Sequence, residues 1–263
     1  MYRTLVLSDT HCGSIVGLTP PAFWNDTNRR WLELLWKFFD NTLRQVGPVD
    51  LLVALGDLID GTQKNDPTAL LEPDLGVQAG MAVDIVRMVR AKKRAIVKGT
   101  GYHTDEHCSF EKFVADKLET EAVDEYCCDI YGRLCQFRHV IGRSDIPYGQ
   151  FTQVGKELIR EALQALLEEY AAATLVGRAH AHYYVGVELG DSILGIRKAF
   201  VNPAMQLKGP KQTKFTRGLR TMYYHVGMTL IEIDRTGWPT VRPILLPLKM
   251  YAPREYECLT EQS

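Results

Sequence analysis

The chain has 263 residues, with 31 Lys and Arg against 32 Asp and Glu, so its formal net charge is −1. Hydrophobic residues make up 46% and charged residues 24%, which is typical of a globular protein and excludes a disordered or collagen-like chain. The balanced charge argues against a generally basic nucleic-acid coat protein, but not against a local basic patch. Because the chain can bury a large core and contains no Pro/Ser-rich linker, we expect residues 1–263 to form a single domain.

The cysteines and the apolar segments indicate a cytoplasmic protein. Six cysteines are present without a C-x-x-C pair, and the adjacent Cys127 and Cys128 are a poor start for a disulfide framework. We therefore expect free thiols in a reducing cytosol rather than a thiolate metal site. No apolar run approaches the ~18 residues of a membrane span. The N-terminus also lacks the long apolar region and cleavage site of a signal peptide.

The first part of the chain alternates predicted strands and helices. A short apolar run predicts a strand over 4–7, and aromatic and leucine side chains at helical spacing predict a well-buried helix over 28–46. Three elements continue the alternation: a strand over 49–55, a helix over 75–92 and a strand over 94–97. This alternation is typical of an α/β protein.

The remaining elements end in a block of strands. We expect a helix over 109–118 with Ser109 as its N-cap, a strand over 134–140, a helix over 152–172 and a brief strand over 174–176. One face of the 152–172 helix carries Ile159, Leu163, Leu166 and Tyr170. Strand-like runs then cover 183–189, 193–201, 223–233 and 241–246. The order predicts an α/β fold in which two packed mixed β-sheets are flanked by helices.

Carboxylates and imidazoles follow the predicted strands at the points where those strands end. In an open sheet, ligands bind at the carboxyl ends of strands, so these segments are expected to converge. Each is weak alone, because a D-x-H triplet occurs by chance, Gly-Asp is ordinary turn chemistry and a lone histidine is commonly structural. The ordered series is stronger evidence for a site. It comprises Asp9/His11, Asp57/Asp60, His103, His139 and His180/His182.

In order and type, these motifs resemble those of the calcineurin-like metallophosphoesterase superfamily: D-x-H, G-D-x-x-D, G-N-H-[DE], a separate His and G-H-x-H. The resemblance spans about residues 4 to 202 and implies a four-layer αββα sandwich. The segment from His139 through Pro147, with Asn202 to Gln206, also resembles a phage and prophage branch of the superfamily.

Two departures from the family pattern concern the third and last motifs. Thr100 stands where the family has a metal-binding Asn, and two residues are inserted before His103. A threonine hydroxyl is a poorer ligand than an amide carbonyl, so water, Asp105 or Glu106 could complete the second site. The glycine of the last motif is also displaced, because the chain reads Gly177-Arg178-Ala179-His180.

The resemblance implies two divalent transition-metal ions. Two cations ~3.5–4 Å apart would hold an attacking hydroxide and neutralise phosphoryl oxygens. Mixed imidazole and carboxylate ligands suit Mn, Fe, Zn or Co, of which Mn is favoured. Asp57 would bridge the ions. The first site would be completed by Asp9, His11 and His182, and the second by His139 and His180 with Thr100 or a water.

The resemblance also implies residues that assist the reaction. His103 would act as the general acid, with a packing role near the metals as the alternative reading. Asp60 is expected to orient a ligand or an arginine. His107 is interpreted as a surface residue or a substitute acid, and His225 as structural.

Substrate contacts are predicted at three places. Arg143 and Arg178 lie close in sequence to the proposed ligands and could contact phosphate. Lys208, Lys211, Lys214, Arg217 and Arg220 recur every three residues without an intervening acid. This 208–220 stretch could bind a nucleic-acid backbone, or it could be a solvated basic loop.

Together the motifs predict a hydrolase that cleaves phosphoesters with a binuclear metal centre. Phosphodiesters, including nucleic acids, are slightly favoured over monoesters. The alternative is a catalytically weak or silent binding scaffold of the same fold. Thr100 favours the scaffold, whereas the otherwise complete set of ligands favours the enzyme.

Overall fold

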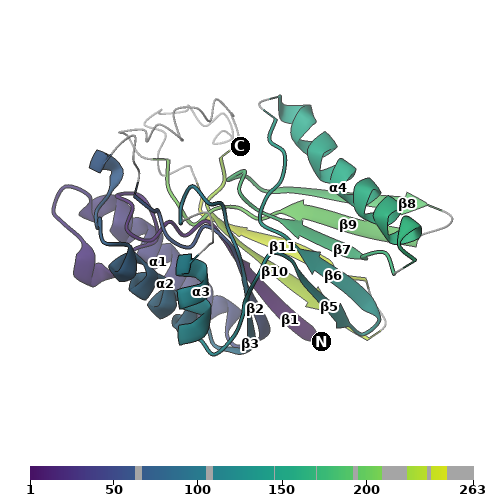
Figure 1. The fold of residues 1–263 in the computed structure, drawn as a ribbon, viewed down its shortest axis with the longest axis horizontal. Helices are drawn as coiled ribbons and strands as arrows, with labels where there is room; N and C mark the ends of the chain where they lie inside the picture. Colours follow the sequence, from purple (N-terminus) through teal and green to yellow (C-terminus); the bar gives the residue numbers. More distant parts are fainter. Residues whose placement is uncertain are drawn as a thin grey trace, which may run out of the picture.

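Two β-sheets packed face to face form the centre of the structure, and helices cover their outer faces (Figure 1). The computed structural model describes residues 1–62, 67–104, 109–144, 146–169, 171–191, 195–208, 224–235 and 238–247. Both sheets mix parallel and antiparallel pairs. The two sheets and their helical layers confirm the predicted fold class.

The first sheet has six strands in the order β11-β10-β1-β2-β3-β4. These are β11 (Thr240–Leu245), β10 (Gly227–Ile233), β1 (Tyr2–Leu7), β2 (Val49–Leu55), β3 (Ala91–Val97) and β4 (Ala122–Val123). The strands from β1 to β4 are parallel, and β10 and β11 extend the sheet in antiparallel pairing.

The second sheet has five strands in the order β5-β6-β7-β9-β8. These are β5 (Tyr126–Ile130), β6 (Arg133–Phe137), β7 (Leu175–Arg178), β9 (Gly195–Val201) and β8 (Val185–Asp191). The strands β6, β7 and β9 are parallel, and the two edge strands pair antiparallel.

Four α-helices and two short 3-10 helices complete the described part of the chain. They are α1 (Arg29–Val46), α2 (Leu75–Met88), α3 (Ser109–Lys117) and α4 (Pro147–Leu167), with η1 (Pro21–Phe23) and η2 (Pro67–Ala69). Residues of α1, α2 and α3 share one core with the first sheet, whereas α4 packs on the second sheet. In this part of the chain, no helix is both long and apolar enough to cross a membrane.

Alternating side chains of the parallel strands enter two different cores. Leu5 and Leu7 of β1 face the helices, whereas Val6 faces the second sheet. In β2, Leu52 and Ala54 likewise point to the helices. Successive side chains of a strand point to opposite faces, so a strand covered on both faces is apolar throughout. This explains why the predicted 49–55 strand coincides with β2.

Several predicted boundaries differ from the structure. The helix predicted over 75–92 ends at Met88, and β3 begins at Ala91 rather than at residue 94. Val89 is already extended, and parallel pairing with β2 starts at Ala91. The side-chain pattern of residues 89–92 is compatible with a longer helix, but pairing with β2 holds the chain from Ala91 in a strand. The predicted 134–140 strand is β6 and ends at Phe137, while the 223–233 strand begins only at Gly227.

The β5–β6 hairpin and the short β4 were not predicted. The hairpin turns at Tyr131 and Gly132, whose φ angles are 54° and 76°. Two consecutive residues with positive φ form the tight turn that matches the twist of a hairpin. The glycine is the sequence signal that could have revealed it. Among the described residues, the thiols of Cys12, Cys127, Cys128 and Cys135 are free.

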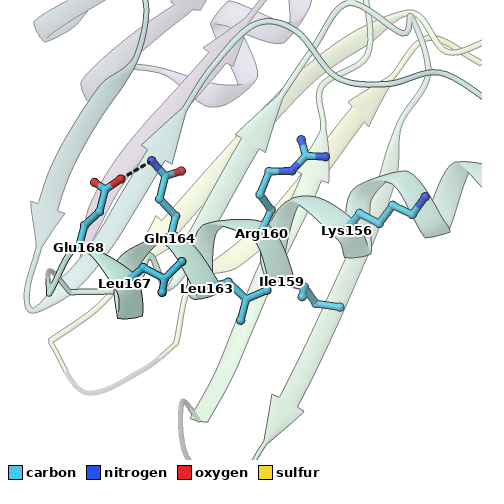
Figure 2. A pocket seen from close by; sticks show the side chains of 7 residues that line it. All are labelled: Lys156, Ile159, Arg160, Leu163, Gln164, Leu167 and Glu168. Carbon is cyan, nitrogen blue, oxygen red and sulfur yellow. Dashed lines mark hydrogen bonds between the residues drawn. The ribbon is translucent and has the colours of Figure 1, made fainter.

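The helix α4 begins five residues before the predicted start, and its apolar face points to solvent. Pro147 occupies the first turn, where a backbone N–H has no partner within the helix, so the N–H that proline lacks is not needed. The buried face consists of Val154 and Leu158 together with small or polar residues. Ile159, Leu163 and Leu167 project on the exposed side (Figure 2). Tyr170, also predicted on this face, lies outside the described residues.

Candidate metal centre

The predicted site residues lie together at one end of the two sheets. Asp9 and His11 follow β1, Asp57 and Asp60 follow β2, and Thr100 and His103 follow β3. His139 follows β6, and His180 and His182 follow β7 of the other sheet. Parallel strands end at the same edge of a sheet, and the packed sheets bring both edges together. The structure therefore gathers residues from five separate strand ends.

Three overlapping groups of side chains are arranged to hold cations. Within each group the candidate ligand atoms all lie within 4.8 Å of one another. The Nε2 atoms of His11 and His182 are 3.4 Å apart. Ligands ~2.1 Å from one ion are separated by about this distance, so the donor set fits a transition metal. The groups are Asp9/His11/His182, His11/Asp57/His103 and Asp57/His139/His180.

Asp57 is the carboxylate shared by two of these groups. Its Oδ1 accepts hydrogen bonds from the backbone nitrogen of Thr100 at 2.6 Å and from the Thr100 hydroxyl at 3.0 Å. Its Oδ2 lies 2.9 Å from His139 Nε2 and 3.7 Å from His180 Nδ1. These contacts place Asp57 between the histidines that follow the second sheet and Thr100 of the first.

The backbone around the site adopts an uncommon conformation. Asp9, His11, Asp57, His180 and His182 all have positive φ, between 44° and 68°. A non-glycine residue in this region is strained, and such strain persists only where surrounding contacts enforce it. Five candidate ligands therefore share a strained backbone that turns their side chains toward one another.

Two glycines allow the strand ends to approach closely. Gly56 has φ of +77°, and a Cβ atom there would lie 2.5 Å from His139 Nδ1. A Cβ atom on Gly99 would lie 2.2 Å from Asp57 Oδ1. Any side chain at either position would displace a candidate ligand, so these positions require glycine.

Opposite charges set the ionisation of the buried ligands. Burial opposes the ionisation of Asp9, but His182 and His139 outweigh it and lower the pKa of Asp9 to about 2. Burial also opposes the charging of His139, but Asp57 outweighs it and raises the pKa of His139 to about 9. Burial lowers the pKa of His182 despite the opposing charge of Asp9. At neutral pH the metal-free site thus contains ionised carboxylates paired with a protonated His139.

Asp60 and Tyr224 orient three of the histidines. The Asp60 carboxylate lies 3.1 Å from His11 Nδ1, and its backbone carbonyl lies 2.9 Å from His103 Nδ1. The Tyr224 hydroxyl is 3.5 Å from His182 Nδ1 and donates to the carbonyl of Gln206. Contacts of this kind fix the ring orientation of a metal-binding histidine. Asp60 thus contacts His11, a candidate ligand, and its orienting role stays a prediction.

The geometry of His103 differs from that of a resting general acid. Burial lowers the pKa of His103, although Asp57 acts in the opposite direction. The imidazole is therefore neutral at pH 7, and the Nδ1 hydrogen donates to the carbonyl of Asp60 at 2.9 Å. Its Nε2 then carries a lone pair and lies 3.9 Å from Asp57 Oδ2. In the metal-free site, His103 is set to accept a proton or bind a cation.

The two predicted substrate arginines have different surroundings. Arg178 is only 2% exposed, and its guanidinium donates to Glu157, to Gln136 and to the carbonyl of Gly177. These bonds hold it beneath α4, so its predicted contact with substrate does not fit the structure. Arg143 is exposed. Proximity in sequence to a ligand did not distinguish the two, because Arg178 ends β7 and points toward α4, whereas Arg143 lies in the segment between β6 and α4.

Other predicted residues lie at or beyond the edge of the described structure. Lys208 is exposed, and the rest of the basic 208–220 stretch lies outside the described residues. Asp105, Glu106 and His107 also lie outside them. His225 accepts a hydrogen bond at Nδ1 from the backbone nitrogen of Tyr184 at 2.9 Å, as a structural histidine does.

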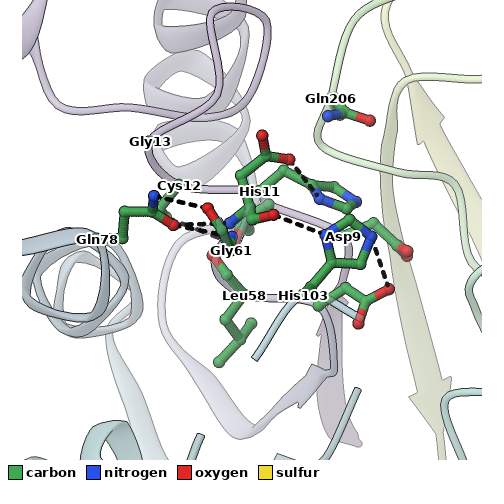
Figure 3. Close-up of polar contacts among 12 residues, drawn as sticks. Asp9, His11, Cys12, Gly13, Leu58, Gly61, Gln78, His103 and Gln206 are labelled. Atoms are coloured by element: carbon green, nitrogen blue, oxygen red, sulfur yellow. Dashed lines mark hydrogen bonds and ion pairs between the residues drawn. The ribbon is translucent and has the colours of Figure 1, made fainter. Parts of the chain in front are cut away.

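Gln78 is a buried residue of α2 that the sequence did not single out. Its Oε1 accepts hydrogen bonds from the backbone nitrogens of Asp60 and Gly61 at 3.1 and 3.0 Å. Its Nε2 donates to the carbonyl of Gly61, so the amide clamps the loop that carries Asp60 (Figure 3). A polar residue in the apolar stretch of a predicted helix is the signal that could have identified it.

Glu111 is a second buried residue that the sequence did not reveal. It lies in the first turn of α3, where an acidic residue is usually solvated, yet it is 1% exposed. Its carboxylate lies beside Thr104, and neither oxygen forms a hydrogen bond of good geometry with the described residues. Burial, and then the negative charge of Asp57, raises the pKa of Glu111 to about 7. A carboxyl group that retains its proton near neutral pH therefore lies close enough to the site to interact with Asp57.

Glu111→Gln is expected to change how the stability of the metal-free protein depends on pH. Glu111 is neutral in both states below pH 4.5, but between pH 4.5 and 7 it ionises only when unfolded. The free energy of unfolding of the wild type should therefore fall by up to about 3 kcal/mol as the pH rises through this range, whereas that of the variant should not fall for this reason. Urea unfolding in EDTA at pH 4, 6 and 8 measures the difference. The control is Glu121→Gln at an exposed position, and parallel curves for wild type and Glu111→Gln would contradict the assignment.

Comparison with known proteins identifies the fold. No family model and no curated protein matches the chain. A dimetal phosphatase from Danio rerio has a similar structure, with 10% identity, 92% of this chain and 95% of that chain covered, and a TM-score of 0.50.

Two other solved structures are similar at lower TM-scores. An archaeal phosphodiesterase is 12% identical, with 93% of this chain and 99% of that chain covered and a TM-score of 0.47. Vps29 from Entamoeba histolytica, complexed with zinc, is 14% identical, with 92% and 98% covered and a TM-score of 0.44. Such low identities concern the fold alone. Together with the αββα layers described above, the similarity to the dimetal phosphatase shows that this chain has the metallophosphoesterase fold.

Proposed function

We propose that this protein is a binuclear-metal phosphoesterase that hydrolyses phosphodiesters. The observation that carries the proposal is the clustering of Asp9/His11/His182 and Asp57/His139/His180 into two adjoining donor groups. Bound in these groups, two divalent cations would supply an activated hydroxide and neutralise the charge of the phosphoryl oxygens. The nitrogen-rich donor set suits Mn, Fe, Zn or Co, and we propose Mn as the working ion.

The side chains divide into holding and proton-transfer roles. Asp57 would bridge the two groups, because it forms a donor cluster with His139 and His180 and another with His11, which belongs to the first group. His103 is the proposed proton-transfer residue. With Nδ1 fixed on the carbonyl of Asp60, its Nε2 would take up a proton from solvent when the anionic phosphoester binds and donate it to the leaving oxygen.

A diester fits the described cations better than a monoester. Arg178 is held by Glu157 and Gln136, which leaves Arg143 as the exposed member of the predicted pair. A diester carries one negative charge at neutral pH, whereas a monoester carries nearly two and requires more positive charge around it. We therefore propose a small or polymeric phosphodiester as substrate, with Arg143 in contact with it. Nucleic acid remains one of the substrates to be tested because of the basic 208–220 stretch.

The proposal is tested by assaying EDTA-treated protein with and without Mn²⁺. The substrates are bis-p-nitrophenyl phosphate, p-nitrophenyl phosphate, and single- and double-stranded DNA. Metal-dependent turnover that is faster on the diesters is the expected result. If the protein binds about two ions per chain and turns over none of these substrates, the enzyme is excluded and the alternative scaffold, which Thr100 favours, replaces it.

His103→Ala is expected to lower kcat about 10²- to 10⁴-fold while two ions per chain remain bound. The expectation follows from His103 Nε2, which faces Asp57 but is not needed in either of the two donor groups proposed for the ions. Steady-state kinetics and metal analysis of the same preparations measure both quantities. A lost ion with kcat restored by excess Mn²⁺ would show that His103 is a ligand instead.

A further inference from the structure

The exposed face of α4 is more apolar than a solvated helix face should be. Leu163 is 56% exposed and Leu167 is 82% exposed, although the opposite face of the same helix already packs on the second sheet. A contiguous apolar patch of this kind on a soluble protein usually marks an interaction site. We call it the α4 stripe, and it comprises Tyr148, Phe151, Ile159, Leu163, Leu166 and Leu167.

The charged residues beside the α4 stripe are segregated along the helix. The exposed basic residues Lys156 and Arg160 lie beside its middle, and the exposed acidic residues Glu168 and Glu169 follow its C-terminal end. A groove runs between the apolar side chains and the polar row that contains Arg160 and Glu168 (Figure 2). A helix that binds a membrane surface typically has basic residues along its whole polar flank. The acidic end instead favours a protein partner with the opposite charge order.

We propose that the α4 stripe is the interface of a homodimer in which α4 of one copy packs antiparallel against α4 of a second copy. A two-fold axis makes an interface self-complementary, because each residue of one patch meets its counterpart in reverse order. Antiparallel pairing brings Lys156 and Arg160 of each copy beside Glu168 and Glu169 of the other. The same operation places Ile159 against Leu167 around a central Leu163.

The overlap of the paired helices follows from the position of the two-fold axis. With the axis at Leu163, residues 159–167 of the two copies lie side by side over about 13 Å of each helix, and Tyr148 and Phe151 lie beyond this overlap. Few contacts within the protein must break on pairing. Arg160 donates to Glu157 at 3.0 Å and Gln164 donates to Glu168 at 3.1 Å, both at exposed positions. The apolar side chains of the stripe supply the area that is removed from water on association.

The experiment measures the oligomeric state of the full chain by sedimentation equilibrium between about 1 and 200 μM. The wild type is expected to dimerise. Leu163→Glu, at an exposed position, should raise the dimer dissociation constant at least about 100-fold without unfolding the protein. The matched control is Val140→Glu, which is equally exposed at 57% but lies outside α4 and should leave the dimer unchanged.

Charge exchange tests the antiparallel order. A basic-end variant (Lys156→Glu with Arg160→Glu) and an acidic-end variant (Glu168→Lys with Glu169→Lys) should each dimerise about 10-fold more weakly, because like charges then meet at both ends. An equimolar mixture of the two should recover wild-type affinity as a heterodimer. A monomeric wild type at 200 μM, a dimer that Leu163→Glu does not weaken, or failure of the mixture to recover would each overturn the proposal.

Discussion

Asp57→Asn is expected to lower kcat on a phosphodiester about 10³-fold or more while the fold is retained. Asp57 is the single carboxylate common to two donor groups, and its oxygens contact Thr100 on one side and His139 on the other. Asparagine has the same shape but lacks the negative charge, so it cannot bridge two cations with both oxygens. The variant should bind fewer than two ions per chain.

The measurement combines Mn²⁺-dependent kinetics, metal analysis and thermal unfolding of the same preparation. Asp124→Asn is the matched control, because Asp124 is an exposed carboxylate that pairs only with Lys98 at the surface. It should show wild-type kcat and metal content. A kcat for Asp57→Asn within tenfold of wild type, with both ions bound, would contradict the proposed bridge.

The strand ends of the site could be predicted from the sequence because the strands are covered on both faces. An uninterrupted apolar run such as β2 ends sharply where the sheet ends, so the polar residues Asp57 and Asp60 that follow mark the edge. The same holds for β1 and Asp9. The layers of the fold follow from the order of these elements.

The contacts that orient the ligands could not be predicted in the same way. They depend on packing between elements that are far apart in sequence, as when Gln78 of α2 holds the backbone of Asp60. Glu111 resembles a solvated residue of a helix start, and only the position of α3 against the sheet buries it. Positive φ angles at Asp9 and His11 have only a weak signal in residue type, because Asp and His adopt this region more often than other non-glycine residues but still rarely. Tertiary contacts override local preference at these positions.

Hydrophobic periodicity did not predict which face of α4 is buried. Its spacing correctly predicts a helix and an apolar face, but the face formed by Ile159 and Leu163 is the exposed one. The opposite face is buried through small residues such as Ala162 and Ala165, together with Glu161, which pairs with Arg197. When either of two faces of a helix could pack on a sheet, the sequence of the helix alone does not show which face is buried.

Metal binding to the Asp57/His139/His180 group is expected to strengthen about tenfold per pH unit between pH 6 and 8 and to level off above pH 9. The charge of Asp57 outweighs burial and holds the pKa of His139 at about 9, so His139 carries a proton throughout this range in the metal-free protein. Only the neutral imidazole can coordinate a cation, so binding must release this proton. Asp9 is already ionised, because its pKa is about 2, and contributes nothing to this slope.

Stability of the metal-free protein should change in the opposite direction. A histidine whose pKa is raised on folding contributes stability that is fully present below its unfolded pKa of about 6.5 and is lost as pH rises through about 9. The His139 proton therefore stabilises the metal-free cluster by pairing with Asp57 at 2.9 Å, and it competes with the cation for the same nitrogen. Rising pH therefore weakens the ion pair between His139 and Asp57 and favours binding of a cation to His139.

Competition between the protein and a fluorescent chelator for Mn²⁺ at pH 6, 7, 8 and 9 measures the effect. His139→Gln should bind more weakly at pH 9, and its dependence on pH should be shallower by about one proton per ion. His225→Gln, which changes a histidine that bonds the backbone of Tyr184, should keep the wild-type slope. An equal slope for wild type and His139→Gln would show that the released proton comes from another group, and His139 would then not be the protonated ligand of the second donor group.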